Sequence, residues 1–277
     1  MERKIVIDSS GDLQAMPGFS FASVPLKIVA GDREFVDDSL CDVKQMVEFL
    51  RQYTQRTSTA CPGVGEYIEA FADADEVFCI TITSNLSGSY NAASIAAQTW
   101  AEQHPEGKIH VFDSLSAGPE MALLAEKVGE WIRADRSFDQ IVADGNAYLA
   151  STRLVFSLES LHNLAVNGRV PMVVAKAVGV LGLRLIGQAS EQGTLQPTGK
   201  ARGEKKVIPE LMKKLLSMGY QGGKLRISHC CNPTAAAELT AAVKAQFPDA
   251  DIRSWEARAL VSFYAEVGGL LIGLETA

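Results

Sequence analysis

The stretch that begins at Lys4 and ends at Asp12 reads KIVIDSSGD. In this stretch a short apolar run rich in β-branched residues, which ends at Ile7, is followed by a polar loop that begins at Asp8. This pattern is typical of a buried strand. Two further runs of this kind span residues 77–82 and 109–112. Helical patterns separate the three runs, and this alternation predicts an α/β fold with a parallel sheet flanked by helices.

The helical patterns of the first 150 residues have recognisable starts. Gln45 stands three positions after Asp42, as in a capping box, and predicts that a helix begins there. A second helix is expected after Cys61, with Pro62 at its first position. Apolar residues at helical spacing predict two more helices, over residues 86–100 and 121–132.

After about residue 150 the pattern changes and predicts a second α/β domain. Its expected strands are residues 154–156, 183–188, 225–228 and 252–255, and its expected helices are residues 205–218 and the segment after Asn232-Pro233. We therefore expect two domains, residues 1–150 and 151–277, with a ligand between them.

The composition excludes several classes of protein. The chain has 277 residues, of which 47% are hydrophobic and 21% charged, so it can bury a sizeable core. The net charge is −7 and no long basic stretch occurs, so nucleic acid is not an expected partner. The five cysteines are an odd number without a CxxC pair, which indicates neither a disulfide framework nor a zinc ribbon.

The start of the chain and its most apolar stretch bear on location. The apolar run after Lys4 is too short for a signal peptide. Residues 170–187 contain Lys176 and Arg184, whereas a membrane span needs roughly 18 or more largely uncharged residues. These observations predict a cytoplasmic protein without a membrane span.

Polar loops follow the three predicted strands, at residues 8–12, 83–89 and 113–116. In an open parallel sheet, ligands usually bind beyond the carboxyl ends of the strands. Hydroxyl groups and free amides at helix starts can donate hydrogen bonds to anionic oxygen. The loops predict a site for a carboxylate or phosphate head group, although the same residues could merely cap helices and close turns.

The standard catalytic motifs are not matched. The segment from Gly193 to Ala201 resembles a phosphate-binding loop, but Ala201 stands where magnesium requires Ser or Thr. Ser87 is not in a G-x-S-x-G elbow, and the four histidines have no spacing that indicates a catalytic base or metal site. No cofactor and no metal are expected.

Two other functions remain open from the residues alone. One is an enzyme that acts on a small anionic substrate with Asp8 or Asp113 as the base. The other is a purely structural or regulatory interaction protein, which would leave the three hydroxyl-rich loops unexplained.

Several short motifs occur in an order that is more specific than any one of them. They are IDSSGDL from Ile7, VPL from Val24, TACPGVGE from Thr59, LSGSY from Leu86, DS at Asp113, NGRV from Asn167 and KARG from Lys200. With them, nearly the whole chain resembles the DegV family of bacterial fatty-acid-binding proteins, the lipid-carrying subunits of a two-part fatty acid kinase.

The resemblance implies a role for specific residues at the head-group end of a fatty acid site. The carboxyl group would lie between the two domains, while the acyl chain enters an apolar tunnel to which the second domain contributes. Thr59 matches the family threonine that contacts the carboxyl group, and Ser87 matches the family serine of the L-S-G segment. Ser84 and the amide of Gly88 are close in sequence, and these four residues are the expected head-group contacts. Tyr264 stands where the family often has a histidine, and Ala60 and Cys61 replace Ser and Gln.

The resemblance also implies partners. A long-chain fatty acid would be the ligand, and the catalytic subunit of a fatty acid kinase would phosphorylate its carboxyl group. Arg169 and Arg202 match family arginines, and they are the expected partner contacts. The chain itself would not be an enzyme, and its contact with a membrane would be transient.

Overall fold

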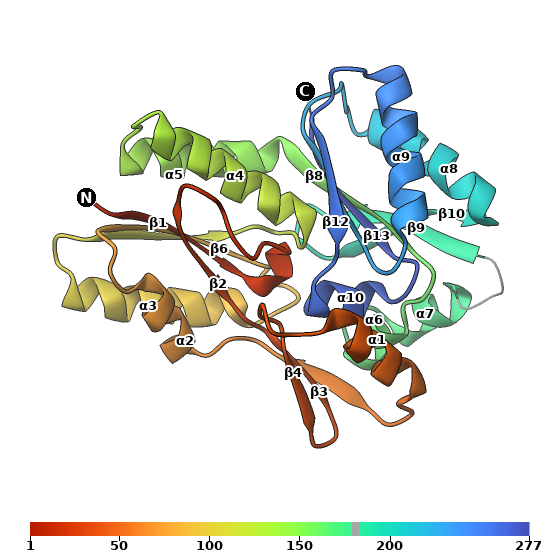
Figure 1. Cartoon of the computed structure of the whole chain (residues 1–277), viewed down its shortest axis with the longest axis horizontal. Coiled ribbons are helices and arrows are strands. Elements are labelled where there is room, and N and C mark those ends of the chain that lie inside the picture. Colours follow the sequence, from red (N-terminus) through yellow and green to blue (C-terminus); the bar gives the residue numbers. More distant parts are fainter. Residues whose placement is uncertain (179–182, 277) are drawn as a thin grey trace.

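The computed structural model describes residues 1–178 and 183–276. Figure 1 shows a mixed α/β molecule, which confirms the predicted fold class. One sheet is parallel and has the order β2-β1-β6-β7, with β1 at Arg3–Asp8, β2 at Ser20–Val24, β6 at Glu76–Thr81 and β7 at Lys108–Asp113. Each of the three apolar runs coincides with one of these strands, and the run 77–82 extends one residue beyond β6.

Helices cover both faces of this parallel sheet (Figure 1). Alternate residues of a strand point to opposite faces, so Ile5 and Ile7 of β1 pack on one side and Val6 on the other. On the first side lie α4 (Pro119–Arg133) and α5 (Phe138–Ala150). On the second side lie α2 (Val64–Phe71) and α3 (Ser89–Gln103).

Two predicted helix starts are wrong by two or three residues. α2 begins at Val64 with Gly63 as its cap, so Pro62 is outside the helix. α3 begins at Ser89 rather than Leu86, because residues 83–88 form a turn in which the amides of Leu86 and Ser87 donate to the Thr83 carbonyl. This turn keeps Ser87 in the loop before the helix.

A three-stranded antiparallel sheet, called the small sheet below, extends from the parallel sheet, and the periodicity did not predict it. It comprises β3 (Lys27–Ala30), β4 (Arg33–Val36) and β5 (Thr57–Ala60) in the order β4-β3-β5. In the motif Val24-Pro25-Leu26, Val24 ends β2, and Pro25 and Leu26 form the break between β2 and β3. Proline has no amide hydrogen to donate to a strand ladder, which favours this break.

The second half of the chain forms a six-stranded sheet in the order β10-β9-β8-β13-β11-β12. Its strands are β8 (Thr152–Leu158), β9 (Leu183–Ala189), β10 (Leu195–Arg202), β11 (Leu225–His229), β12 (Ile252–Glu256) and β13 (Leu270–Glu275). β11 and β12 are parallel, whereas the other described pairs are antiparallel. The predicted second α/β architecture is therefore present with a mixed sheet.

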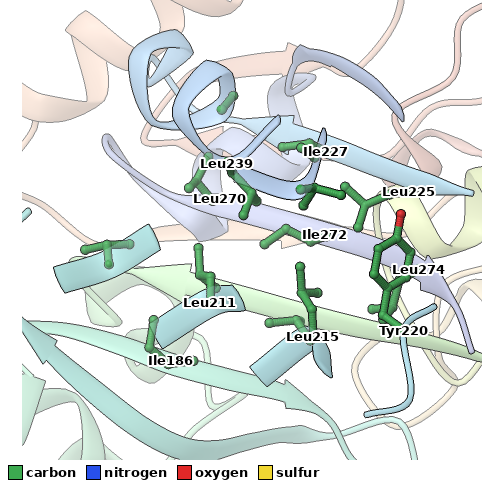
Figure 2. Close-up of a cluster of buried hydrophobic side chains, with 14 of the residues drawn as sticks. Ile186, Leu211, Leu215, Tyr220, Leu225, Ile227, Leu239, Leu270, Ile272 and Leu274 are labelled. Atoms are coloured by element: carbon green, nitrogen blue, oxygen red, sulfur yellow. The ribbon is translucent and has the colours of Figure 1, made fainter. Parts of the chain in front are cut away.

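Two helices, α8 (Val207–Ser217) and α9 (Pro233–Gln246), bury the core of this half. Figure 2 shows Leu211 and Leu215 of α8 facing Ile272 of β13 within one apolar cluster. Asn232 caps α9 through its side chain, and Pro233 occupies the first helical position, as the sequence predicted.

Short elements complete the chain and connect its halves. They are η1 (Ser9–Gly11), η2 (Glu204–Lys206), α1 (Val43–Gln52), α6 (His162–Val166), α7 (Met172–Val178) and α10 (Ala259–Ala265). α10 belongs to the second half of the sequence but packs on Ile28 of β3 and Met46 of α1. We keep the division between residues 150 and 151 as a proposal about independent domains.

Within residues 1–178 and 183–276, no helix has the length and apolar character that crossing a bilayer requires. Residues 179–182, in the middle of the apolar stretch 170–187, lie outside the described residues.

Candidate ligand-binding site

A cavity of about 840 Å³, its open mouth included, lies where the two halves of the chain meet. Both halves contribute to its wall, and most of the wall is apolar. The apolar lining includes Leu154, Phe156 and Leu158 of β8, Leu271 of β13, and Leu260 and Val261 of α10. Ligand pockets typically have predominantly apolar walls with a few placed polar groups.

Two hydroxyl groups from opposite halves meet in this wall. Thr59 is on β5 of the small sheet, Tyr264 is on α10, and their side-chain oxygens are 2.7 Å apart. Burial raises the pKa of the Tyr264 phenol, whereas the bond to Thr59 acts in the opposite direction. The phenol therefore stays protonated at neutral pH and can donate one hydrogen bond.

Ser87 lies in the wall of the same cavity. Its hydroxyl is 2.9 Å from the Ser89 hydroxyl and accepts the Ser89 amide at 3.3 Å, at the start of α3. A hydroxyl beside the amino end of a helix experiences the positive end of the helix dipole. Ser87 thus accepts a hydrogen bond from the start of α3 and also lines the cavity, where its hydroxyl can contact a ligand.

The other two residues expected beside Ser87 are placed differently. Among the described residues, Ser84 and Gly88 are not part of the cavity wall. The Ser84 amide donates to Asp113 Oδ1 at 3.1 Å, and Gly88 is the cap of α3. Their expected contact with a carboxyl group remains a prediction.

The two arginines expected to contact a partner occupy different places in the structure. Arg169 lines the cavity, half-buried, with its Nε donating to the Leu86 carbonyl at 3.2 Å. Its guanidinium carbon is 5.8 Å from the centre of the Tyr264 ring, which puts a positive charge near the hydroxyl pair. Arg202 is the exposed last residue of β10 and, in the described part of the chain, is outside the cavity wall.

Two buried carboxyl groups stand behind cavity-lining serines. Ser10 donates its hydroxyl hydrogen to Asp8, and Ser116 donates to Glu120. Asp8 also accepts the Ile82 amide at 2.8 Å, and Glu120 accepts the Thr152 hydroxyl at 2.8 Å. Burial raises the pKa of Asp8 to about 6 and that of Glu120 to about 7.

Asp113, the second candidate base, also serves its own loop. Its Oδ1 accepts the amides of Ser84 and Leu115 at 3.1 and 3.2 Å. Neither Asp8 nor Asp113 is part of the described cavity wall. Both carboxyl groups therefore do what the structural interpretation of these loops expected, which is to accept amide and hydroxyl hydrogen bonds.

Sequence reasoning missed much of the wall. Thr83 and Ser116 lie in polar loops that the sequence indicated, whereas Thr194 is a polar residue of the wall that no pattern indicated. The apolar residues 154, 156 and 158 had a signal, because every second residue of a strand faces the same side. The alternation alone could not tell which face of β8 meets a cavity.

The cavity between an α/β half and a mixed-sheet half defines an apolar-ligand-binding protein. A family model described as "Uncharacterised protein, DegV family COG1307" matches residues 2–275. A DegV domain-containing protein of Streptococcus pneumoniae strain R6, spr0652, is 41% identical over 279 residues, which cover 99% of each chain. The chain therefore belongs to the DegV family, as the motifs predicted.

Two solved structures have the same fold over nearly the whole chain. A DegV family protein from Eubacterium eligens, loaded with heptadecanoic acid, is 42% identical with a TM-score of 0.97, covering 99% of this chain and 100% of the other. The Fatty Acid Kinase (Fak) B3 protein of Streptococcus pneumoniae, loaded with linoleic acid, is 40% identical with a TM-score of 0.98, covering 100% of both chains.

Proposed function

We propose that this protein binds a long-chain fatty acid and presents its carboxyl group to a separate kinase, which phosphorylates it to an acyl phosphate. The observation that carries the proposal is the cavity, with its apolar wall and the Thr59–Tyr264 hydroxyl pair in the same lining. Two relatives that are at least 40% identical were solved with fatty acids bound, which supports the same ligand class here.

The energetics suit such a ligand. Burial of an acyl chain contributes about 0.8 kcal/mol for each methylene removed from water. A hydrogen bond to a charged group adds about 1.5–3 kcal/mol. In this proposal the wall formed by β8, β13 and α10 supplies the first contribution. Thr59, Ser87 and Tyr264 supply the second, with Ser84 and the Gly88 amide as further candidates.

The partner in this proposal is the ATP-dependent catalytic subunit of a fatty acid kinase. In this proposal the kinase subunit, and not this chain, supplies the catalytic groups for phosphoryl transfer. The name of the Streptococcus pneumoniae relative supports such a kinase partner. A guanidinium group suits carboxylate and phosphate oxygens, so Arg169 is proposed to act beside the carboxyl group and Arg202 on the exposed contact surface.

Transfer of a fatty acid from a bilayer requires transient membrane contact, and we propose α7 as the contacting element. Met172 is 45% and Val173 74% exposed on this helix, and Lys176 of the same helix is exposed. Apolar side chains beside a cation favour an anionic membrane surface.

The proposed place of action is the cytoplasm, where ATP and such a kinase would be available.

The direct test is mass spectrometry of organic extracts from purified protein. A tightly held fatty acid should survive purification and appear in the extract at a fixed ratio to protein. After the lipid is stripped, a fluorescent fatty acid should titrate to saturation, and unlabelled oleic acid should displace it. Absence of lipid together with absence of binding in the titration would contradict the proposal.

The alternative of an enzyme with Asp8 or Asp113 as base has less support. Both carboxyl groups accept hydrogen bonds within their own loops, and the described cavity wall contains neither. No observation of the site favours this alternative.

A further inference from the structure

The small sheet holds α10 at two points. One is the bond between Thr59 of β5 and Tyr264 near the end of the helix. The other is Asp37, which directly follows β4 and is 1% exposed. β5, which contains Thr59, and β4, which precedes Asp37, both pair with β3. Ile28 of β3 pairs with Thr59 on one side and with Phe35 on the other. The same three-stranded sheet and the residue that follows it therefore contact both ends of one helix.

The contact through Asp37 consists of several bonds. The carboxyl oxygens of Asp37 accept the Ala259 amide at 2.9 Å and the Leu260 amide at 3.2 Å. Arg258 Nε is 3.4 Å from Asp37 Oδ1, and another Arg258 nitrogen donates to the Asp37 carbonyl. The residue that caps α10, Arg258, makes no side-chain cap bond to the helix. Asp37 thus provides from a distant loop the acceptors that a capping residue normally provides.

The rest of α10 faces the cavity or the core beside the small sheet. Leu260, Val261 and Tyr264 line the cavity, whereas Ala259 and Phe263 pack on β3 and α1. A helix is stiff, so fixing its first amides also fixes where the backbone of Tyr264 lies and from which point its side chain extends toward Thr59. A ligand carboxyl group can use that hydroxyl only where it lies within hydrogen-bond distance.

We infer that Asp37 is a positioning residue for the head-group site: by holding the start of α10 on the small sheet, it sets the Tyr264 hydroxyl beside Thr59 for the ligand carboxyl group. This inference rests on the proposed function, because it assigns the positioning of the same head-group site. It assigns to Asp37 an effect on affinity that is exerted through Tyr264.

The test is a double-mutant cycle on full-length, delipidated protein with oleic acid as the probe. We expect Asp37→Asn and Tyr264→Phe each to weaken binding by about ten-fold, the size of a lost hydrogen bond. If Asp37 acts through Tyr264, the double variant should bind within about two-fold of Tyr264→Phe alone. Independent, multiplied losses in the double variant, or wild-type affinity in Asp37→Asn, would overturn the inference.

A matched control separates positioning from general stability. Glu126 of α4 pairs with the fully buried Arg226 at 2.6 Å, away from the cavity wall. We expect Glu126→Gln to lower the melting temperature but to leave oleic acid affinity of the folded protein within about two-fold of wild type. An equal loss of affinity in this control would show that any destabilised variant binds poorly, which also overturns the inference.

A substitute variant and a comparison with wild-type protein complete the experiment. If Asp37→Asn does not fold, Asp37→Ser retains one acceptor for the start of α10 and enters the same cycle. Failure of wild-type protein to bind oleic acid would contradict the proposed function itself. Binding by wild type, with a loss in Tyr264→Phe but none in the Asp37 variants, would contradict the positioning role alone.

Discussion

The Thr59 hydroxyl on β5 and the Tyr264 hydroxyl on α10 lie 2.7 Å apart, although 205 residues separate them in the sequence. Each is the other's hydrogen-bond partner, and each lines the cavity. Each hydroxyl has one hydrogen, and the bond between them uses one of the two, so the pair can donate the other hydrogen to a ligand carboxylate without a cation in the pair itself.

Replacement Thr59→Val removes the hydroxyl and retains the shape of the side chain. We expect fatty acid affinity to fall by about 10- to 150-fold, because one charge-assisted hydrogen bond is worth about 1.5–3 kcal/mol. Calorimetric titration of folded, delipidated protein measures this loss. Wild-type affinity in Thr59→Val would show that the carboxyl group lies elsewhere in the cavity.

Replacement Ser87→Ala tests whether the Ser87 hydroxyl binds ligand or only caps α3. The hydroxyl accepts the Ser89 amide at 3.3 Å, so we expect a loss of stability of about 1 kcal/mol. We expect a larger loss in fatty acid affinity, of the size given for Thr59. Thermal unfolding and titration of the same samples compare the two effects. A change in stability with unchanged affinity would leave Ser87 as a cap alone.

An assay that couples fatty acid binding to phosphorylation by the kinase subunit should distinguish the exposed Arg202 from the cavity-lining residues. We expect Arg202→Ala to keep fatty acid affinity within about two-fold of wild type, since loss of a solvated charge outside the cavity changes binding little. Formation of acyl phosphate by the kinase subunit should fall strongly, because the partner contact is lost. Equal phosphorylation of variant and wild type would remove Arg202 from the contact surface.

The carboxyl groups of Asp8 and Asp113 serve to distinguish a carrier from an enzyme. We expect Asp8→Asn and Asp113→Asn to retain kinase-dependent acyl phosphate formation per folded molecule, since both groups accept loop hydrogen bonds. Asp8→Asn should also lower stability, because a fully buried acceptor of the Ile82 amide is altered. A loss of turnover at unchanged lipid affinity in either variant would favour the catalytic alternative.

The pH dependence of stability should contain a contribution from Glu120. Burial raises its pKa in the folded protein to about 7 from an ordinary value of 4.5. Between these two pH values the folded protein retains a proton that the unfolded chain has lost, so stability decreases as pH rises from about 4.5 to about 7. The shift corresponds to at most about 3 kcal/mol.

Replacement Glu120→Gln makes this contribution measurable. The amide keeps one acceptor for Thr152 or Ser116 but cannot ionise, so the variant should lose less stability than wild type over the same interval. Urea unfolding at several pH values from 4.5 to 7.5 provides the comparison. Parallel curves for the two proteins would show that Glu120 does not titrate in this range.

Much of the fold could be predicted from local patterns. The strands of the parallel sheet followed from β-branched apolar runs that end at polar loops, and the cap at Asn232-Pro233 marked the start of α9. The starts of α2 and α3 were misplaced because side chains near a helix end can favour more than one first residue. The strands β3, β4 and β5 were missed because they are four residues long and give too little periodicity to detect.

The sequence by itself determined the α/β class, the family and the polar loops that follow the strands, since these depend on residue type and near-neighbour spacing. Only the tertiary structure decided that Thr59 meets Tyr264, that Asp37 holds the start of α10, and that Arg169 faces the cavity while Arg202 faces solvent. The physical reason is that these relationships join segments far apart in the chain. They depend on how the small sheet, α10 and the six-stranded sheet pack together, and packing between distant elements has no local sequence period.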